Sequence, residues 1–118
     1  MPSYLLSVHT GASRSPSNMS EEERQRSYER VAEIEHDLRA SGAWVFSGRL
    51  TGPDDAAVIR AGEGTVTRTD GPFVETKEQL GGFYIISTDE PQQAAAWAAR
   101  VSEAIGQPIE VRPFFAHS

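Results

Sequence analysis

Four ionisable side chains and one aromatic side chain gather within nine consecutive residues, and together they could carry out acid–base chemistry. The stretch begins at Asp70 and contains Phe73, Glu75, Lys77 and Glu78. A carboxylate held beside a lysine in a partly dry cleft can have its pKa moved toward neutrality, as general acid–base catalysis requires. The alternative is structural, because Asp70 can cap its own turn while the other charged groups pair with one another or with water.

Residues that reverse the chain direction lie on both sides of this stretch. Gly71 can adopt a positive φ, and Pro72 fixes its own φ while moving Gly71 away from the α region. Gly81 and Gly82 then precede an apolar strand. We therefore treat residues 70–82 as one motif loop. Charged groups between two turns suit a binding or catalytic loop, and they are also typical of an ordinary surface loop.

Two residues outside the motif loop are further candidates. His9 ends the first expected strand, where a cleft beside the motif loop could open, and a neutral imidazole there can act as a base or a ligand. Its alternative is a simple structural hydrogen bond. Arg49 could hold an anionic ligand, although arginines on strands usually face water. The predicted catalytic residues are Asp70 and His9, and the predicted ligand-binding residues are Phe73, Glu75, Lys77, Glu78 and Arg49.

The sequence contains no motif for a metal ion or a cofactor. Its three histidines are widely separated, it has no cysteine, and neither HxxxH nor HExxH occurs. The segment Gly62–Gly64 leads into a β-branched strand rather than a helix, which excludes a dinucleotide fingerprint. We therefore expect neither a metal nor a cofactor.

Composition narrows the class of protein. The 118 residues are enough for a single domain over 1–118 with its own core. The absence of cysteine excludes disulfides and cysteine nucleophiles. No apolar run is long enough for secretion or membrane spanning, which predicts a cytoplasmic protein. The net charge of −6 argues against nucleic-acid binding as the main activity.

Hydrophobic periodicity and turn residues predict the elements that must position the candidate residues. Strands are expected over residues 3–9, 43–50, 57–61, 65–69, 83–87 and 109–112. One helix is capped by Ser20 and ends near Ser41, with Tyr28 on its apolar stripe, and a second follows Pro91 and stops at Gly106. Residues 11–19 are expected to form a flexible loop, and 62–64 a three-residue hairpin loop.

This order predicts an α+β fold of the ferredoxin-like split βαβ type, with an antiparallel sheet and an inserted β-hairpin. Helices on one side of such a sheet leave its other side bare. Trp44, Phe46, Phe83 or Tyr84, and Phe114 would make that side a large apolar patch. A second copy packed sheet to sheet would cover the patch, so we expect a homodimer through the open sheet face.

The stretch from Asp70 to Glu78, followed by Gly81–Tyr84, resembles the signature of the YCII-related family in its DGPF branch. Segments 94–100 and 109–113 resemble that branch's second helix and last strand, so the resemblance covers about residues 4–115. It implies a ferredoxin-like fold that pairs as a dimeric α/β barrel. Most members of the branch have no assigned function, and many occur beside extracytoplasmic-function sigma factors, which suggests a regulatory link.

The sequence departs from this family at one informative place. The YCII proteins proper are thought to use a histidine on the first helix and an aspartate near the end of the second. Those places hold Val31 and Val101 here, while His36 lies five residues further along and points to a different side. The dyad therefore does not carry over.

Three hypotheses for function follow. The first is a protein that binds a small organic molecule between the sheet and the Asp70–Glu78 loop of a homodimer. The second is a lyase or isomerase that uses Asp70 or His9 on a small carboxylated compound. The third is a regulatory module that partners an extracytoplasmic-function sigma factor.

Overall fold

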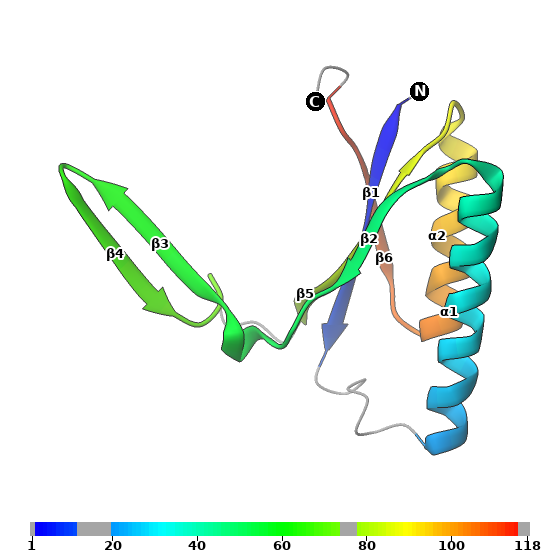
Figure 1. The fold of residues 1–118 in the computed structure, drawn as a ribbon, viewed down its shortest axis with the longest axis horizontal. Coiled ribbons are helices and arrows are strands. Elements are labelled where there is room, and N and C mark those ends of the chain that lie inside the picture. The colour runs from blue at the N-terminus through cyan, green and yellow to red at the C-terminus, as the bar shows by residue number, and fades with distance from the viewer. Residues whose placement is uncertain (1, 12–19, 74–77, 116–118) are drawn as a thin grey trace.

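The computed structural model describes residues 2–11, 20–73 and 78–115, and these form an α+β protein (Figure 1). The strands are β1 (Ser3–Gly11), β2 (Trp44–Arg49), β3 (Ala57–Gly62), β4 (Thr65–Asp70), β5 (Glu78–Ser87) and β6 (Ile109–Pro113). The helices are α1 (Glu21–Ser41) and α2 (Pro91–Ile105), with a short 3₁₀ turn, η3 (Pro53–Asp55), before β3. This order confirms the predicted fold class.

Four strands form one antiparallel sheet in the order β2-β5-β1-β6. Both helices lie side by side on the same face of this sheet (Figure 1). The arrangement is that of a ferredoxin-like fold, as predicted. Most of residues 11–19, expected to be a flexible loop, lie outside the described residues.

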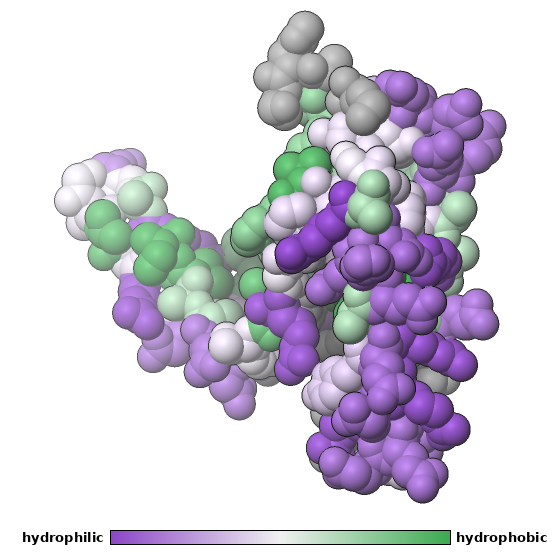
Figure 2. All heavy atoms as spheres, turned by 45° about the vertical axis from the view of Figure 1, so that its right-hand side comes forward, coloured by the Kyte–Doolittle hydropathy of each residue, from purple (hydrophilic) through white to green (hydrophobic). Residues whose placement is uncertain are grey.

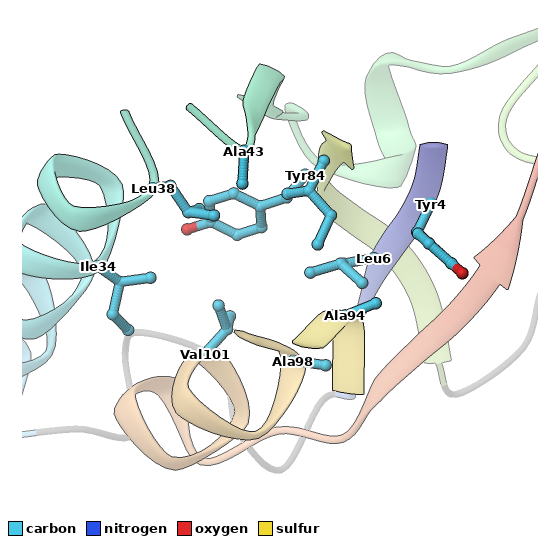
Figure 3. Packing of buried hydrophobic residues seen from close by; sticks show 10 residues of the cluster. Tyr4, Leu6, Ile34, Leu38, Ala43, Tyr84, Ala94, Ala98 and Val101 are labelled. Atoms are coloured by element: carbon cyan, nitrogen blue, oxygen red, sulfur yellow. The ribbon is translucent and has the colours of Figure 1, made fainter. Parts of the chain in front are cut away.

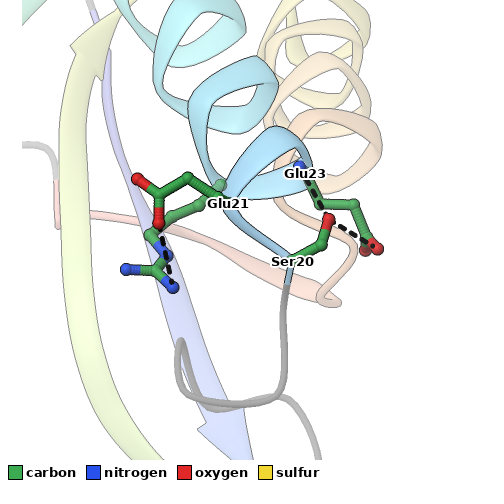
Figure 4. A network of polar contacts seen from close by, with 4 residues as sticks. Ser20, Glu21 and Glu23 are labelled. Atoms are coloured by element: carbon green, nitrogen blue, oxygen red, sulfur yellow. Dashed lines mark hydrogen bonds and ion pairs between the residues drawn. The ribbon is translucent and has the colours of Figure 1, made fainter.

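The ends of α1 follow from local chemistry. The Ser20 hydroxyl accepts a hydrogen bond from the Glu23 N–H at 3.1 Å and donates to the Glu23 carboxylate at 3.1 Å (Figure 4). This is a serine cap, although Glu23 returns to the hydroxyl rather than to the Ser20 backbone. At the other end, Gly42 has a φ of 81°, and its N–H donates to the Arg39 carbonyl. A glycine adopts this left-handed conformation without steric cost, so the helix ends there.

The core lies between the sheet and the two helices (Figure 3). Leu6 from β1 and Ile86 from β5 are fully buried against Leu38 of α1 and Val101 of α2. Tyr28, predicted on the buried stripe of α1, is instead 48% exposed. With 21 residues α1 is about 30 Å long, so its first turns extend past the core and only Ile34 and Leu38 are buried.

Strands β3 and β4 pair only with each other and form a separate two-stranded sheet. We call this hairpin, residues 57–70, the arm. The predicted three-residue loop at its tip is wrong, because Gly62 pairs with Thr65 and remains in the ladder. Glu63 and Gly64 form a two-residue turn with φ values of 49° and 81°. Positive φ at both central residues is the geometry that matches the twist of paired strands.

The predicted turn after the arm is present. Gly71 has a φ of 104°, and its N–H donates to the Ala56 carbonyl at 2.7 Å. This bond joins the two ends of the arm at its base. A side chain at residue 71 would be strained in this conformation, which explains a glycine before Pro72.

Candidate functional site

The sheet face opposite the helices is apolar at its centre. Leu5, Phe83 and Ile85 alternate along their strands with the buried residues Leu6, Tyr84 and Ile86, so they point away from the helices. This open face is formed by Leu5, Phe46, Phe83 and Ile85. The prediction that Trp44 lies there is wrong, because Trp44 pairs with Ile86 and packs against the core on the helix side. Phe46 is 54% exposed, and its ring centroid lies 6.0 Å from that of Phe83.

His9 and Arg49 lie at the same end of the sheet, on the two strands that flank β5. His9 pairs with Leu80, directly after a register shift between Val8 and His9. Arg49 is the last residue of β2 and pairs with Gly82. The sequence suggested each residue separately, and the strand order brings them to one end. Register shifts of this kind re-aim side chains and are frequent beside active sites.

Gly82 is a site residue that sequence reasoning assigned only to a turn. It lies inside β5, and a Cβ there would come 3.0 Å from the Gly48 carbonyl oxygen. The missing side chain lets β2 and β5 approach closely beside Arg49. The signal in the sequence was a glycine within an apolar strand, which often marks a close backbone approach.

Asp70 and Phe73 lie at the base of the arm and are open to solvent. The Asp70 carboxylate is 3.3 Å from Nε of Arg68, and its side chain is 87% exposed. Phe73 is 76% exposed, with the Arg60 guanidinium carbon 5.5 Å from its ring centroid. An aspartate this exposed in a single chain lacks the dry surroundings that acid–base catalysis needs.

The rest of the predicted loop site is outside the structural description. Glu75 and Lys77 lie outside the described residues. Glu78 is the first residue of β5 and pairs with Gly11, and only its backbone is described. Their predicted roles in ligand binding stay predictions.

Two surface hollows lie on the helix side of the molecule. One, of about 530 Å³, is lined in part by Ser41 at the end of α1 and by Thr88 and Trp97 around the start of α2. The other, of about 330 Å³, lies where Arg26 of α1 faces Glu103 of α2. Neither hollow is lined by any of the predicted site residues.

The positions that correspond to a helical His–Asp dyad are used for packing. Val101 is 1% exposed in the core and Val31 is half-buried, whereas His36 is on the exposed side of α1. Burial, together with the smaller effect of the Glu35 carboxylate, raises the pKa of Tyr84 to about 12. Tyr84 is therefore a neutral core residue at ordinary pH.

The described part of the chain contains neither a group of metal-binding side chains nor a helix that could span a membrane. Its histidine, aspartate and glutamate side chains form no group that could hold a metal ion. Neither α1 nor α2 is long and apolar enough to cross a lipid bilayer. What the geometry offers is an apolar floor with the His9 imidazole at one end, which suits a small ligand with an apolar body and a polar group. Arg49 lies at the same end on the other face of the sheet.

Two comparisons with known proteins bear on this arrangement. The model of the YCII-related domain family matches residues 8–115. An uncharacterized protein of Rhizobium meliloti (strain 1021) is 35% identical over 97 residues, which are 80% of this chain and 77% of that protein. The family match spans the sheet, both helices and the arm, and so the chain belongs to the YCII-related domain family.

Proposed function

We propose that this protein binds a small organic molecule in a homodimer, in a pocket between the sheet and the Asp70–Glu78 loop. The observation that carries the proposal is the open face, whose apolar centre ends at His9, while Arg49 lies at the same end of the sheet on the opposite face. An apolar floor with a few convergent polar groups is the usual composition of a small-molecule site. The motif that begins at Asp70 resembles the DGPF branch of the family. We take this resemblance as support for a pocket at the end of the sheet where the motif loop begins.

A second copy packed on the open face would supply the missing cover. A soluble monomer seldom exposes a contiguous apolar patch of this kind, because the patch would favour association. Phe46 at 54% exposure and Phe114 at 40% are the largest side chains left uncovered around the sheet. The dimer would exclude water from the floor of the pocket and strengthen polar contacts at its end.

One observation favours a catalytic version of this site. His9 is half-buried and lies beside the register shift between β1 and β5, where Gly81 is the extra residue. In a lyase or isomerase, His9 or Asp70 would move the proton, and Lys77 or an arginine would hold a substrate carboxylate. Turnover of an identified ligand that is lost in His9→Gln would favour this second function.

A thermal-shift screen tests the binding proposal. Small organic acids and phenols are added to wild type, to Asp70→Ala and to Glu33→Ala, which removes an equally negative charge from the exposed surface of α1. A ligand that binds only the folded protein raises the melting temperature by mass action. We expect a compound that stabilises wild type and Glu33→Ala but not Asp70→Ala.

Two outcomes would contradict the proposal. Equal shifts in all three proteins would put the ligand away from the motif loop. No shift with any compound would leave a protein partner, such as an extracytoplasmic-function sigma factor, as the better hypothesis. Co-purification with such a factor would then be the measurement to make.

A further inference from the structure

The arm projects from the body of the protein. Neither β3 nor β4 packs on a helix or on the four-stranded sheet, and the space-filling view shows the arm standing away from the body above its base (Figure 2). The Cα radius of gyration is 16.4 Å. A compact domain of this length would have a radius of about 13.5 Å. The chain is therefore more extended than a protein that buries its surfaces only within itself.

The two faces of the arm differ in chemistry. Residues directly opposite each other in the ladder share a face, so Ile59 lies with Arg68, and Ala61 with Val66. The apolar arm face carries Ala57, Ile59, Ala61 and Val66 with the Arg68–Asp70 ion pair. The polar arm face carries Val58, Arg60, Thr65, Thr67 and Thr69. Ile59 is 58% exposed and Val66 is 71% exposed, and hydrophobic colour gathers along the arm in Figure 2.

An arm of this kind needs a partner to be stable. A single two-stranded hairpin is at best marginally stable in water, and three strands or a packed layer are needed to hold it. At the base of the arm, the Gly71 N–H donates a hydrogen bond to the Ala56 carbonyl. No described helix or strand of the chain covers the apolar arm face.

A second copy of the chain fits this requirement best. Phe46 on the open face and Ile59 and Val66 on the apolar arm face are each more than half exposed. Beside Phe46, the open face is extended by Leu5, Phe83 and Ile85. A stable dimer buries about 800 Å² per partner. A two-fold axis lets one contact cover both the open face and the arm in both copies.

Charge does not oppose this contact, although the chain carries a net charge of −6. The apolar arm face carries Arg68 and Asp70, one of each sign. On the open face, Arg112 pairs with Leu5 and Glu110 pairs with Ser7, again one of each sign. The surfaces that would meet are thus neutral, while the acidic excess lies elsewhere, and self-association meets no net like-charge repulsion there.

We infer that the arm is an intersubunit clasp: its apolar face packs on the second copy and closes the pocket at the base of the arm. Asp70 lies on the apolar arm face, so docking of the arm covers a site residue that a single chain leaves open, whereas Phe73 lies against Arg60 of the polar arm face. This inference rests on the proposed function for the dimer. It goes further by assigning the inserted hairpin to the interface and making the site incomplete in one chain.

Two valines on opposite faces of the arm test the clasp. Val66, 71% exposed, is on the apolar arm face and the half-buried Val58 on the polar arm face, and each is changed to serine. Sedimentation equilibrium should give a dimer dissociation constant about tenfold or more higher for Val66→Ser, since a two-fold interface loses the apolar contact twice. Val58→Ser should stay within about threefold of wild type. Far-UV circular dichroism checks that both variants are folded.

A second measurement compares the reactivity of thiols placed on the two faces of the arm. The chain has no cysteine, so a single introduced thiol is the only one that reacts. Ala61→Cys is on the apolar arm face and Thr67→Cys on the polar arm face. At concentrations where the protein is dimeric, the Ala61→Cys thiol should react with a disulfide reagent about tenfold or more slowly than after dilution to monomer. The Thr67→Cys thiol should react equally in both states.

The outcomes separate this inference from the proposed function. A dimer in which both thiols react equally, or in which both serine variants behave as wild type, overturns the clasp and leaves the dimer intact. A monomer at every concentration overturns the clasp and the dimer together. A protected Ala61→Cys thiol in a protein that binds no compound in the thermal-shift screen supports the clasp and contradicts ligand binding alone.

Discussion

The body and the arm are both built from antiparallel strands, yet they solve the problem of covering an apolar face differently. In the body, the face that carries Leu6 and Ile86 is covered by α1 and α2, and both side chains are fully buried. In the arm, Ile59 and Val66 have the same alternating pattern and stay more than half exposed. The comparison teaches that a strand pattern specifies which face is apolar without specifying which molecule covers it.

The largest expected effect is the loss of stability when a core side chain of the body is truncated. Leu38→Ala should lower the free energy of unfolding by about 2–5 kcal/mol, because it leaves a cavity in a core that cannot fully collapse. Leu50→Ala, at a leucine that is 46% exposed outside the core, is the matched control and should cost less than about 1 kcal/mol. Urea denaturation at one fixed protein concentration measures both. Equal costs at the two leucines would contradict the assignment of the core.

A smaller effect, confined to alkaline pH, is specific to the body. The pKa of Tyr84 is raised from 10.0 to about 12 in the folded protein, so the folded state holds the phenolic proton more tightly than the unfolded state. The stabilisation is fully present below pH 10 and is lost as the pH rises toward 12. In Tyr84→Phe this loss should disappear. Urea midpoints between pH 8 and about 12 measure it, and identical alkaline losses in both proteins would show that Tyr84 is not responsible.

The smallest expected effect is on the polar arm face. The Thr67 hydroxyl donates to the Arg60 carbonyl at 3.4 Å in an exposed position. Thr67→Ala should change the free energy of unfolding by no more than about 0.5 kcal/mol, as is usual for exposed sites. Thermal denaturation at one fixed protein concentration measures it. A loss above about 1 kcal/mol would mean that the polar arm face is covered as well, and the two faces of the arm would no longer differ.

Much of the fold was predictable because it depends on neighbours in the sequence. The cap at Ser20, the helix end at Gly42 and the turn at Gly71 each follow from the backbone preferences of one or two residues. The exceptions are equally instructive. The loop at the arm tip was predicted one residue too long, since whether Gly62 stays paired depends on the twist of both strands. Tyr28 has the right spacing for burial and lies beyond the end of the core.

The candidate site was predictable only in part. His9 and Arg49 were found as single residues of suitable chemistry, but their positions at one end of the sheet, on opposite faces, depend on β5 lying between their strands. Gly82 was predicted as a turn residue. The close approach of the Gly48 carbonyl to its Cα, which leaves little room for a side chain, exists only when β2 and β5 are paired. Pairing of strands far apart along the chain is set by packing of the whole sheet, which no local pattern encodes.

The sequence by itself determined the elements, their apolar faces and the absence of cysteine chemistry, because these depend on residue type and on spacing along one strand or helix. The tertiary structure decided which apolar faces are buried. It covers one face of the sheet with two helices and leaves the open face and the apolar arm face uncovered (Figure 1). The physical reason is that burial is a property of what packs on a surface, and none of the described helices and strands packs on these two faces.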